Sequence, residues 1–240
     1  MYDEYYESRE VSDRGRGFLQ WWHSRLLNHI FRVAGKPSSL LEVGAGWGFI
    51  GDAASQEGVE YHGIELSERQ TERLRETGLD VVQARIPPYP DGPPVDMIYA
   101  AHLIEHFPTW SDAESFVAAS RDRLEPGGSL VIVAPDILSW RGRFWDVDWS
   151  HGSPTTLRRV RQLLEETGME ITYAAYAGGG RFGTWAPTIA SFAASLVPIA
   201  FGEWLTQAIL GRPYWYSFMG TLGWRQVVLV GRKRPDQPEG

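Results

Sequence analysis

A short glycine-rich turn between two apolar runs constrains the fold of this chain more than any other feature. The apolar run Leu40-Leu41-Glu42-Val43 leads into Gly44-Ala45-Gly46-Trp47-Gly48, and a second run, Val59 to Ile64, ends in the acid Glu65. A strand that feeds a glycine turn and then a helix brings backbone N–H groups close to a ligand. An acid at the end of the next strand can accept hydrogen bonds from a ribose diol. The pattern predicts a nucleoside site at the carboxyl edge of a parallel sheet.

The glycine spacing disfavours a dinucleotide as that nucleoside. The dinucleotide fingerprint, G-x-G-x-x-G, needs a third glycine that lets the helix pack closely on the strand. Phe49 stands at that third position, and the glycine comes one residue earlier, at Gly48. An NAD-dependent oxidoreductase is therefore the weaker interpretation of this turn.

The pattern E-x-G-x-G-x-G is similar to the first motif of the class I S-adenosylmethionine-dependent methyltransferases. Three later segments resemble that family in the same order: His62 to Gln70 its second strand and ribose acid, Val95 to His106 its fourth strand and following loop, and Leu124 to Val133 its L-x-P-G-G turn and fifth strand. The resemblance covers roughly residues 38–175. It implies a doubly wound α/β fold with a mostly parallel seven-stranded sheet, the last strand antiparallel, and S-adenosyl-L-methionine as the cofactor.

The resemblance also implies where the cofactor binds. The backbone of Gly44, Gly46 and Gly48 would line its methionine and ribose portion, Glu42 would orient its amino-acid end, and Glu65 would bind both ribose hydroxyls. Adenine would lie near Ala84 and Arg85. The other residues expected at the cofactor are Leu66, Gln83, Ala101 and His102. The family often has an acid at the position of Gln83 in the third strand. The side-chain amide of Gln83 can still accept a hydrogen bond from the adenine amino group.

Two histidines are candidates for the base that an oxygen or nitrogen acceptor can require. Neutral imidazole is suited to accepting a proton near pH 7. His106 follows the fourth strand and His151 precedes a later helix, so both should project from loops at the carboxyl edge. His106 can equally cap a helix or bond the backbone. The remaining histidines that we assign to packing or to the surface are His23, His29 and His62.

The segment His102 to His106 also reads H-x-x-E-H, the inverted zinc-peptidase pattern. That pattern needs its ligands on one helix face, whereas this segment follows a strand and is interrupted by Pro108. The loop also resembles the E-x-x-E-H of some quinone-biosynthesis methyltransferases, which can hold a divalent ion. His102 replaces the first acid, and hard cations prefer oxygen ligands. We therefore predict no metal site.

Aromatic residues cluster after the fifth strand and again late in the chain. They can wall an acceptor pocket, with interleaved arginines that would meet an anionic acceptor, or form a small satellite core beneath a loop. The residues concerned are Trp140, Arg141, Arg143, Phe144, Trp145 and Trp149. Methyltransferases diverge most in these acceptor loops. The sequence predicts a small-molecule or lipid-linked acceptor, methylated at oxygen, and leaves open a catalytically silent binding module.

Periodicity and chain breakers predict the order of the elements. Helices are expected at 17–34, up to 56, between 67 and 78, from 111 to 124 and from 153 to 168, the third with a Ser67/Gln70 and the fourth with a Ser111/Glu114 capping box. Strands are expected at 40–43, 59–64, 80–83, 97–100, 130–134, 171–176 and 226–231. Residues 1–16 should be a flexible segment, and residues 17–240 a single methyltransferase domain with an apolar helical insertion at about 181–222.

The insertion is apolar but broken by Pro198, Glu203 and Gln207, so a membrane span of about 20 residues is not expected. It can pack on the sheet or on a second subunit, as in a homodimer. It can also form an apolar lid or an interfacial helix that admits a lipid-like substrate, with peripheral membrane contact through 186–210.

Charge and cysteine content narrow the remaining classes. The net charge of −7 and the lack of long basic runs argue against nucleic acid as a partner. The absence of cysteine excludes disulfides, and the acidic, aromatic N-terminus is unlike a secretory signal, so a cytoplasmic location is expected.

Overall fold

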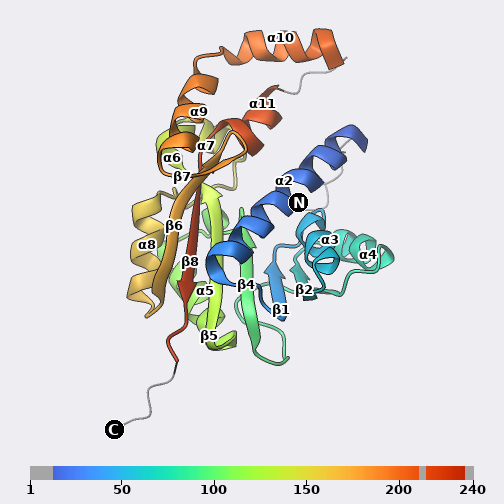
Figure 1. The fold of residues 1–240 in the computed structure, drawn as a ribbon, viewed down its shortest axis with the longest axis vertical. Helices are drawn as coiled ribbons and strands as arrows, with labels where there is room; N and C mark the ends of the chain where they lie inside the picture. Colours follow the sequence, from blue (N-terminus) through green and yellow to red (C-terminus); the bar gives the residue numbers. More distant parts are fainter. Residues whose placement is uncertain (1–12, 211–214, 236–240) are drawn as a thin grey trace.

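One sheet runs through the part of the chain that the computed structural model describes, residues 13–210 and 215–235. Its strands are β1 (Ser39–Val43), β2 (Glu60–Glu65), β3 (Val81–Gln83), β4 (Val95–Ala101), β5 (Leu124–Pro135), β6 (Glu170–Gly178), β7 (Arg181–Gly183) and β8 (Gln226–Arg232). Their order across the sheet is β3-β2-β1-β4-β5-β8-β6-β7 (Figure 1). Strands β1 to β5 run parallel to one another, and β8 is antiparallel to both β5 and β6. The predicted doubly wound α/β fold is confirmed.

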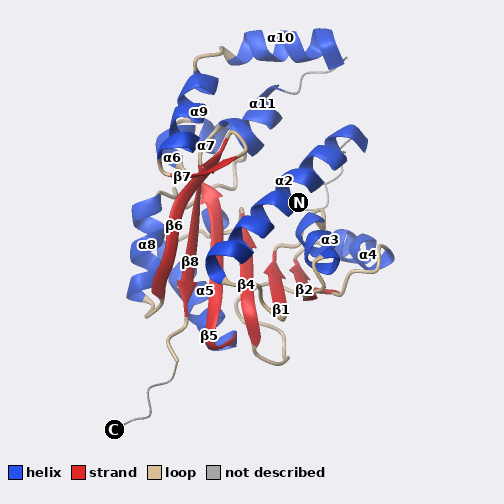
Figure 2. Cartoon of the chain, in the orientation of Figure 1, coloured by secondary structure: helices blue, strands red, loops and turns tan. Residues whose placement is uncertain are grey.

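Helices cover both faces of this sheet (Figure 2). The helices of the described residues are α2 (Asp13–Ala34), α3 (Phe49–Gln56), α4 (Glu68–Glu76), η1 (Ile104–His106), α5 (Trp110–Arg123), α6 (Ile137–Trp140), α7 (Arg143–Asp146), α8 (Leu157–Glu166), α9 (Trp185–Ser195), α10 (Ile199–Leu210), α11 (Trp215–Phe218) and η2 (Met219–Gly223). The apolar side chains of α2 and α3 share one buried cluster with the sheet, and those of α5 and α8 share the other.

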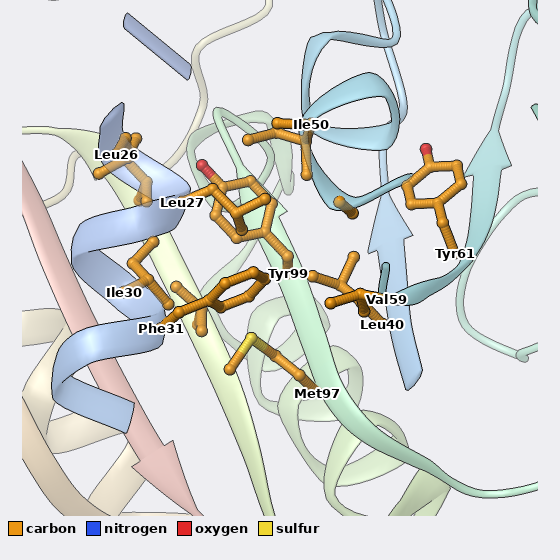
Figure 3. Close-up of a cluster of buried hydrophobic side chains, with 14 of the residues drawn as sticks. Leu26, Leu27, Ile30, Phe31, Leu40, Ile50, Val59, Tyr61, Met97 and Tyr99 are labelled. Atoms are coloured by element: carbon orange, nitrogen blue, oxygen red, sulfur yellow. The ribbon is translucent and has the colours of Figure 1, made fainter. Parts of the chain in front are cut away.

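Alternate residues of the central strands supply these two clusters. In β4, Met97 and Tyr99 belong to the cluster with α2, whereas Ile98 and Ala100 belong to the cluster with α5. Figure 3 shows Leu26, Leu27, Ile30 and Phe31 of α2 lying over Leu40, Met97 and Tyr99. A strand that is covered on both faces needs apolar residues at every position, which is why the predicted strands read as continuous apolar runs.

The first described helix begins earlier than predicted. Residues 13–16 were expected to be flexible, but α2 starts at Asp13. Arg16 lies over the ring of Trp47 at 5.4 Å, so the first turn of α2 packs against the glycine-rich turn after β1. This contact gives the extra helical turn a partner that the sequence pattern does not show. The remainder of the segment expected to be flexible, residues 1–12, lies outside the described residues.

The sheet has eight strands where seven were predicted. The additional strand, β7, pairs antiparallel with β6 at the edge of the sheet. Gly179 and Gly180, at φ of 59° and 70°, turn the chain between the two strands. Glycine adopts such positive φ without steric cost, so these two glycines form a tight hairpin.

The helix caps correct two predictions and confirm part of a third. Ser67 caps α4 by accepting from the backbone N–H of Gln70 at 3.1 Å, as expected, but the side-chain amide of Gln70 donates to Gly46, so only the Ser67 half of the predicted Ser67/Gln70 box is confirmed. The cap of α5 is Thr109, which forms a reciprocal capping box with Asp112, so the predicted Ser111/Glu114 box is wrong. The cap of α8 is Thr156 rather than Ser153, whose hydroxyl donates instead to the carbonyl of Phe107 at 2.8 Å.

The predicted helical insertion before the last strand forms α9, α10 and α11, and its residues 211–214 lie outside the described part. Within the described residues no single helix has both the length and the apolar character to cross a bilayer. Trp185–Ser195 and Ile199–Ile209 meet those criteria only as a pair, and they are bent by 83° relative to each other.

Candidate cofactor and acceptor site

The carboxyl ends of β1 to β4 meet at one edge of the sheet. Val43 pairs with Ile64 on one side and with Ala100 on the other, and Glu65 pairs with Gln83. The residues predicted for the cofactor therefore line this edge, and they are Glu42, Gly44, Gly46, Gly48, Glu65, Leu66, Gln83, Ala84, Arg85, Ala101 and His102. The side chains of Gln83 and Arg85 are exposed, at the end nearest the β3 edge of the sheet.

The glycine turn needs its glycines for two different reasons. Gly44 and Gly48 both have φ of 82°, a conformation that other residues rarely adopt. A Cβ on Gly44 would meet only Leu103, at 3.9 Å, so the space beside this residue is open. A Cβ on Gly48 would lie 2.7 Å from the buried Leu74 and 2.9 Å from Leu79. Gly44 therefore leaves room for a ligand, whereas Gly48 permits the start of α3 to pack against α4.

Glu65 holds the glycine turn in place. Its Oε2 accepts a hydrogen bond of 3.0 Å from the backbone N–H of Gly46, and its Oε1 accepts from Leu66 and Ser67 at 2.9 and 3.0 Å. The side-chain amide of Gln70 donates to the carbonyl of Gly46. The acid of β2 and the turn of β1 are thus coupled, and a ribose diol that binds Glu65 would share these carboxylate oxygens.

Glu42 is a buried acid near the end of β1. Burial raises its pKa to about 8, the hydrogen bond from Tyr61 opposes this rise, and the negative charges of Glu65 and Asp52 add to it. The Tyr61 hydroxyl donates to Oε2 of Glu42 at 2.7 Å. Below about pH 8 the carboxyl is therefore neutral, and a cationic group beside it would favour its ionisation.

The loop after β4 holds His102 in a strained conformation. His102 has φ of 52°, its N–H donates to Val133 at 2.8 Å, and its Nδ1 lies 3.3 Å from Oε1 of Glu105. A positive φ outside glycine is uncommon and is found preferentially at functional sites. Burial would raise the pKa of Glu105, but the hydrogen bond and charge of His102 outweigh it and lower that pKa.

The two predicted bases lie against each other, with ring centroids 4.8 Å apart. Ser150 donates its hydroxyl hydrogen to Asp148 at 2.6 Å and lies 2.9 Å from Nδ1 of His106. Because that hydrogen is used, Ser150 must accept from the Nδ1–H of His106, which leaves the lone pair on Nε2. His151 places its Nδ1 2.5 Å from the carbonyl of Phe144, which fixes its tautomer in the same way.

The bases also adjoin Glu105. A carboxylate oxygen of Glu105 and one ring nitrogen of each of His106 and His151 lie within 4.8 Å of one another, a donor set that can accept a divalent cation. Burial lowers the pKa of His151, and the charge of Glu105 opposes this change. The prediction that the site uses no metal stays a prediction.

His23 of α2 is a packing residue, as assigned, but sequence reasoning missed that it packs beside the glycine turn. His23 stacks on Phe49 with ring centroids 5.4 Å apart, and burial lowers its pKa to about 4, with His102 adding to the effect. One turn earlier, Gln20 donates to the carbonyl of Phe49 at 3.2 Å. Two polar residues three positions apart on an otherwise apolar helix face were the available signal.

The aromatic cluster after β5 divides into two parts. Trp140 and Phe144 are buried with Met219 and Trp224, so they form the satellite core that was one of the two interpretations. Trp145 and Trp149 are exposed, the latter by 76%. Only the exposed pair is available to meet a ligand.

Comparison with known proteins places this geometry in context. A family model described as a methyltransferase domain matches residues 14–174. No curated protein matches the chain.

The fold is shared with solved structures of low sequence identity. A SAM-dependent methyltransferase from Archaeoglobus fulgidus is 18% identical, with a TM-score of 0.62 over 97% of this chain and 99% of that one. The N-methyltransferase NodS from Bradyrhizobium japonicum is 16% identical, with a TM-score of 0.59 over 92% and 98%. The cyclopropane synthase MmaA2 from Mycobacterium tuberculosis is 18% identical, with a TM-score of 0.58 over 86% and 84%. At these identities the likeness concerns the fold.

Proposed function

The chain belongs to the methyltransferase-domain family, and we propose that it transfers the methyl group of S-adenosyl-L-methionine to an oxygen of a small-molecule or lipid-linked acceptor. The chain is thus an S-adenosylmethionine-dependent enzyme, and the nature of its acceptor is the proposal. The observation that carries the proposal is the pair His106 and His151, which present oriented imidazoles beside the edge that the cofactor residues line.

The residues at this edge fit the cofactor. When bound, S-adenosyl-L-methionine supplies a methyl group on a positively charged sulfur, which is a good leaving group. Gly44 leaves open space beside the turn, and Glu65 offers carboxylate oxygens at the end of the neighbouring strand. Glu42 is neutral below about pH 8 and would ionise beside the ammonium of the cofactor's amino-acid end.

The histidines supply what an oxygen acceptor needs. A hydroxyl is a poor nucleophile until a base takes its proton, and a lone pair on Nε2 of His106 can accept it. Burial would raise the pKa of Asp148, but hydrogen bonds from Ser150 outweigh burial and lower it, so Asp148 stays a carboxylate. Through Ser150 it can stabilise the imidazolium that forms on His106.

The enzyme otherwise has to hold donor and acceptor in line and exclude water. The exposed Trp145 lies in α7, and the exposed Trp149 lies in the following loop next to Ser150 and His151, where an apolar part of the acceptor can contact them. This arrangement favours an acceptor with a hydroxyl and an apolar body. The cytoplasmic location and a homodimer stay predictions.

Calorimetric titration with the cofactor tests the binding half of the proposal. Glu65→Ala should weaken binding by about 100-fold, since it removes the ribose acceptor and the anchor of Gly46. Glu68→Ala, three residues later on the surface of α4, is the matched control and should bind as the wild type does. Unchanged affinity in Glu65→Ala would contradict the assignment.

Mass spectrometry tests the acceptor half. Cell extracts incubated with the enzyme and methyl-labelled cofactor should yield labelled products that carry the label on oxygen. His106→Ala with His151→Ala should abolish labelling while cofactor affinity is retained. Labelling on nitrogen or carbon alone would overturn the oxygen assignment, and no labelling with intact binding would favour a catalytically silent binding module.

A further inference from the structure

Exposed apolar side chains gather at one end of the molecule. Eleven of the thirteen large apolar side chains exposed in the described part of the chain lie between residues 138 and 209, so they are not spread evenly over the surface. Three lie in or just after α6 and α7, three lie on α9 with Leu196 directly after it, and four lie on α10. This is the end at which α6 follows directly from the carboxyl end of β5 (Figure 1). Exposed apolar side chains that gather at one end of a molecule in this way indicate an interaction site.

The large apolar side chains of α9 lie on its exposed face, whereas a surface helix usually buries its apolar face. Its exposed face carries residues spaced four, three and four apart, which are Trp185, Ile189, Phe192 and Leu196. The opposite face is attached to the protein, where Ser191 lies within hydrogen-bond distance of Ser139 of α6, at 2.7 Å. The inner face thus fixes the helix, and the outer face is left for a partner.

Helix α10 extends this surface beyond the sheet. Figure 1 shows it at the top of the view, past the end of the sheet and joined to the body through α9. Phe201, Trp204 and Leu205 are exposed on it. Between residues 185 and 210 the one charged residue is Glu203, whose carboxylate accepts from the backbone N–H of Trp215 at 3.3 Å. The two helices therefore present almost no charge to their surroundings.

The shape and the charges of this region suit a bilayer surface. The two helices are bent by 83° relative to each other, and this bend allows both of them to lie within the interface. Tryptophan, as at Trp185 and Trp204, prefers the boundary between headgroups and acyl chains. Exposed arginines lie at the base of α9: Arg181 precedes it, Arg25 donates to Gly180 at 3.3 Å, and Arg141 follows the α6 segment that contacts α9.

These cations complement anionic headgroups. Within residues 138–152 and 180–210 the exposed charged side chains are Arg141, Arg181 and Asp146 of α7, and Arg25 of α2 adds a further cation beside Gly180, in a chain whose net charge is −7. A local excess of arginine beside an uncharged apolar surface attracts an anionic leaflet. A second copy of this chain would bring the same arginines and the same convex helix pair, which complement each other poorly.

We propose that α9 and α10 dock the carboxyl edge of the sheet onto an anionic lipid bilayer, from which the methyl acceptor enters the site. Leu138, Trp145 and Trp149 are also exposed, and Trp149 directly precedes Ser150 and His151 in the chain. An acyl-bearing acceptor can therefore contact these side chains on its way from the bilayer toward the bases. The acceptor's route rests on the proposed function, whereas bilayer docking does not.

Vesicle flotation of the full-length protein tests the docking. The probes are vesicles of phosphatidylcholine alone and vesicles that also contain phosphatidylglycerol. The wild type should float with the anionic vesicles and less with the neutral ones. Phe192→Glu and Trp204→Glu, at side chains exposed by 66% and 63%, should each reduce the bound fraction about tenfold. Arg181→Glu should remove the preference for phosphatidylglycerol.

A matched control separates docking from misfolding. Val82→Glu places the same charge at an apolar residue exposed by 40% on β3, at the far edge of the sheet, and should float as the wild type does. All variants should keep the wild-type affinity for the cofactor. Wild type that stays at the bottom with both vesicles, or Trp204→Glu that floats normally, overturns the proposal.

Two outcomes distinguish bilayer docking from self-association and from a water-soluble acceptor. If light scattering shows a dimer that Phe192→Glu converts to a monomer, and no flotation occurs, the surface binds a second copy and the proposal is wrong. If the protein floats and its variants do not, but labelled cofactor yields only water-soluble products, docking stands and the lipid-linked acceptor is refuted.

Discussion

The hydroxyl of Tyr61 donates a 2.7 Å hydrogen bond to Glu42 across the paired strands β1 and β2. Both side chains are buried, and the pair lies just below the turn in which Gly44 leaves room for a ligand. A buried carboxyl that keeps its proton near neutral pH can ionise when a cation binds beside it. The cofactor edge is therefore sensitive to pH.

The free energy of unfolding should fall with rising pH because of Glu42. Its pKa rises from an ordinary 4.5 to about 8 in the folded chain, so unfolding releases a proton between these two values. Stability due to this group is present below about pH 4.5 and is lost as the pH rises toward about 8, by a few kcal/mol in all. Glu42→Gln should lose less stability than the wild type between about pH 5 and pH 8 in urea denaturation. Parallel curves would contradict the raised pKa.

Alanine should affect the two glycines of the turn differently. Gly44→Ala adds a Cβ in open space, so its positive φ alone should lower the free energy of unfolding by about 1–2 kcal/mol. The same Cβ should weaken the binding of the cofactor. Gly48→Ala adds a Cβ 2.7 Å from the buried Leu74, so overpacking should add about 1–3 kcal/mol to a similar φ cost. Denaturation and calorimetry of the two variants check this. Equal effects on both quantities would show that the glycines share one role.

Local signals were sufficient for the elements that build the cofactor edge. Apolar runs located β1, β2, β4 and β5, and the hydroxyl of Ser67 located the start of α4, because these features depend on residues that are close in sequence. The start of α5 was misplaced because Thr109 and Ser111 are both good caps, and the choice between them depends on tertiary packing. The hairpin strand β7 is three residues long and carries no periodic signal of its own.

The sequence predicts which edge of the sheet carries the candidate site, but it does not predict the contacts between the side chains there. The order of parallel strands brings Glu65 and His102 to one edge whatever their side chains do. The hydrogen bond between His106 and Ser150 joins residues 44 positions apart in two loops, and His23 reaches the site from a helix at the start of the described chain. Such contacts depend on how loops and helices pack, which one sequence does not encode locally.

Asp148 and Ser150 should act as positioning residues for His106. Asp148→Asn keeps the shape but removes the charge that stabilises a protonated His106, and should lower kcat about 10-fold to 100-fold with KM and cofactor affinity unchanged. Ser150→Ala should have a similar effect, and Ser150→Thr should restore most of the rate. Asp146→Asn on α7 is the control and should leave kcat at the wild-type value. A rise in KM without a change in kcat would show an effect on acceptor binding instead.

Asp136 and Arg225 should stabilise the region that carries the docking helices. Arg225 binds the fully buried Asp136 through Nε at 2.7 Å and donates from Nη1 to Thr188 of α9 at 2.9 Å, so one guanidinium joins the end of β5 to the inserted helices. Removing one partner leaves a buried charge unpaired, and Arg225→Met or Asp136→Ala should cost about 3–5 kcal/mol in urea denaturation. The half-exposed pair Arg161 and Glu165, at 3.0 Å, is the matched control, and Glu165→Gln should cost at most about 0.5 kcal/mol. Both pairs have comparable distances, so a similar loss at the two sites would show that burial does not set the strength of the Asp136 pair.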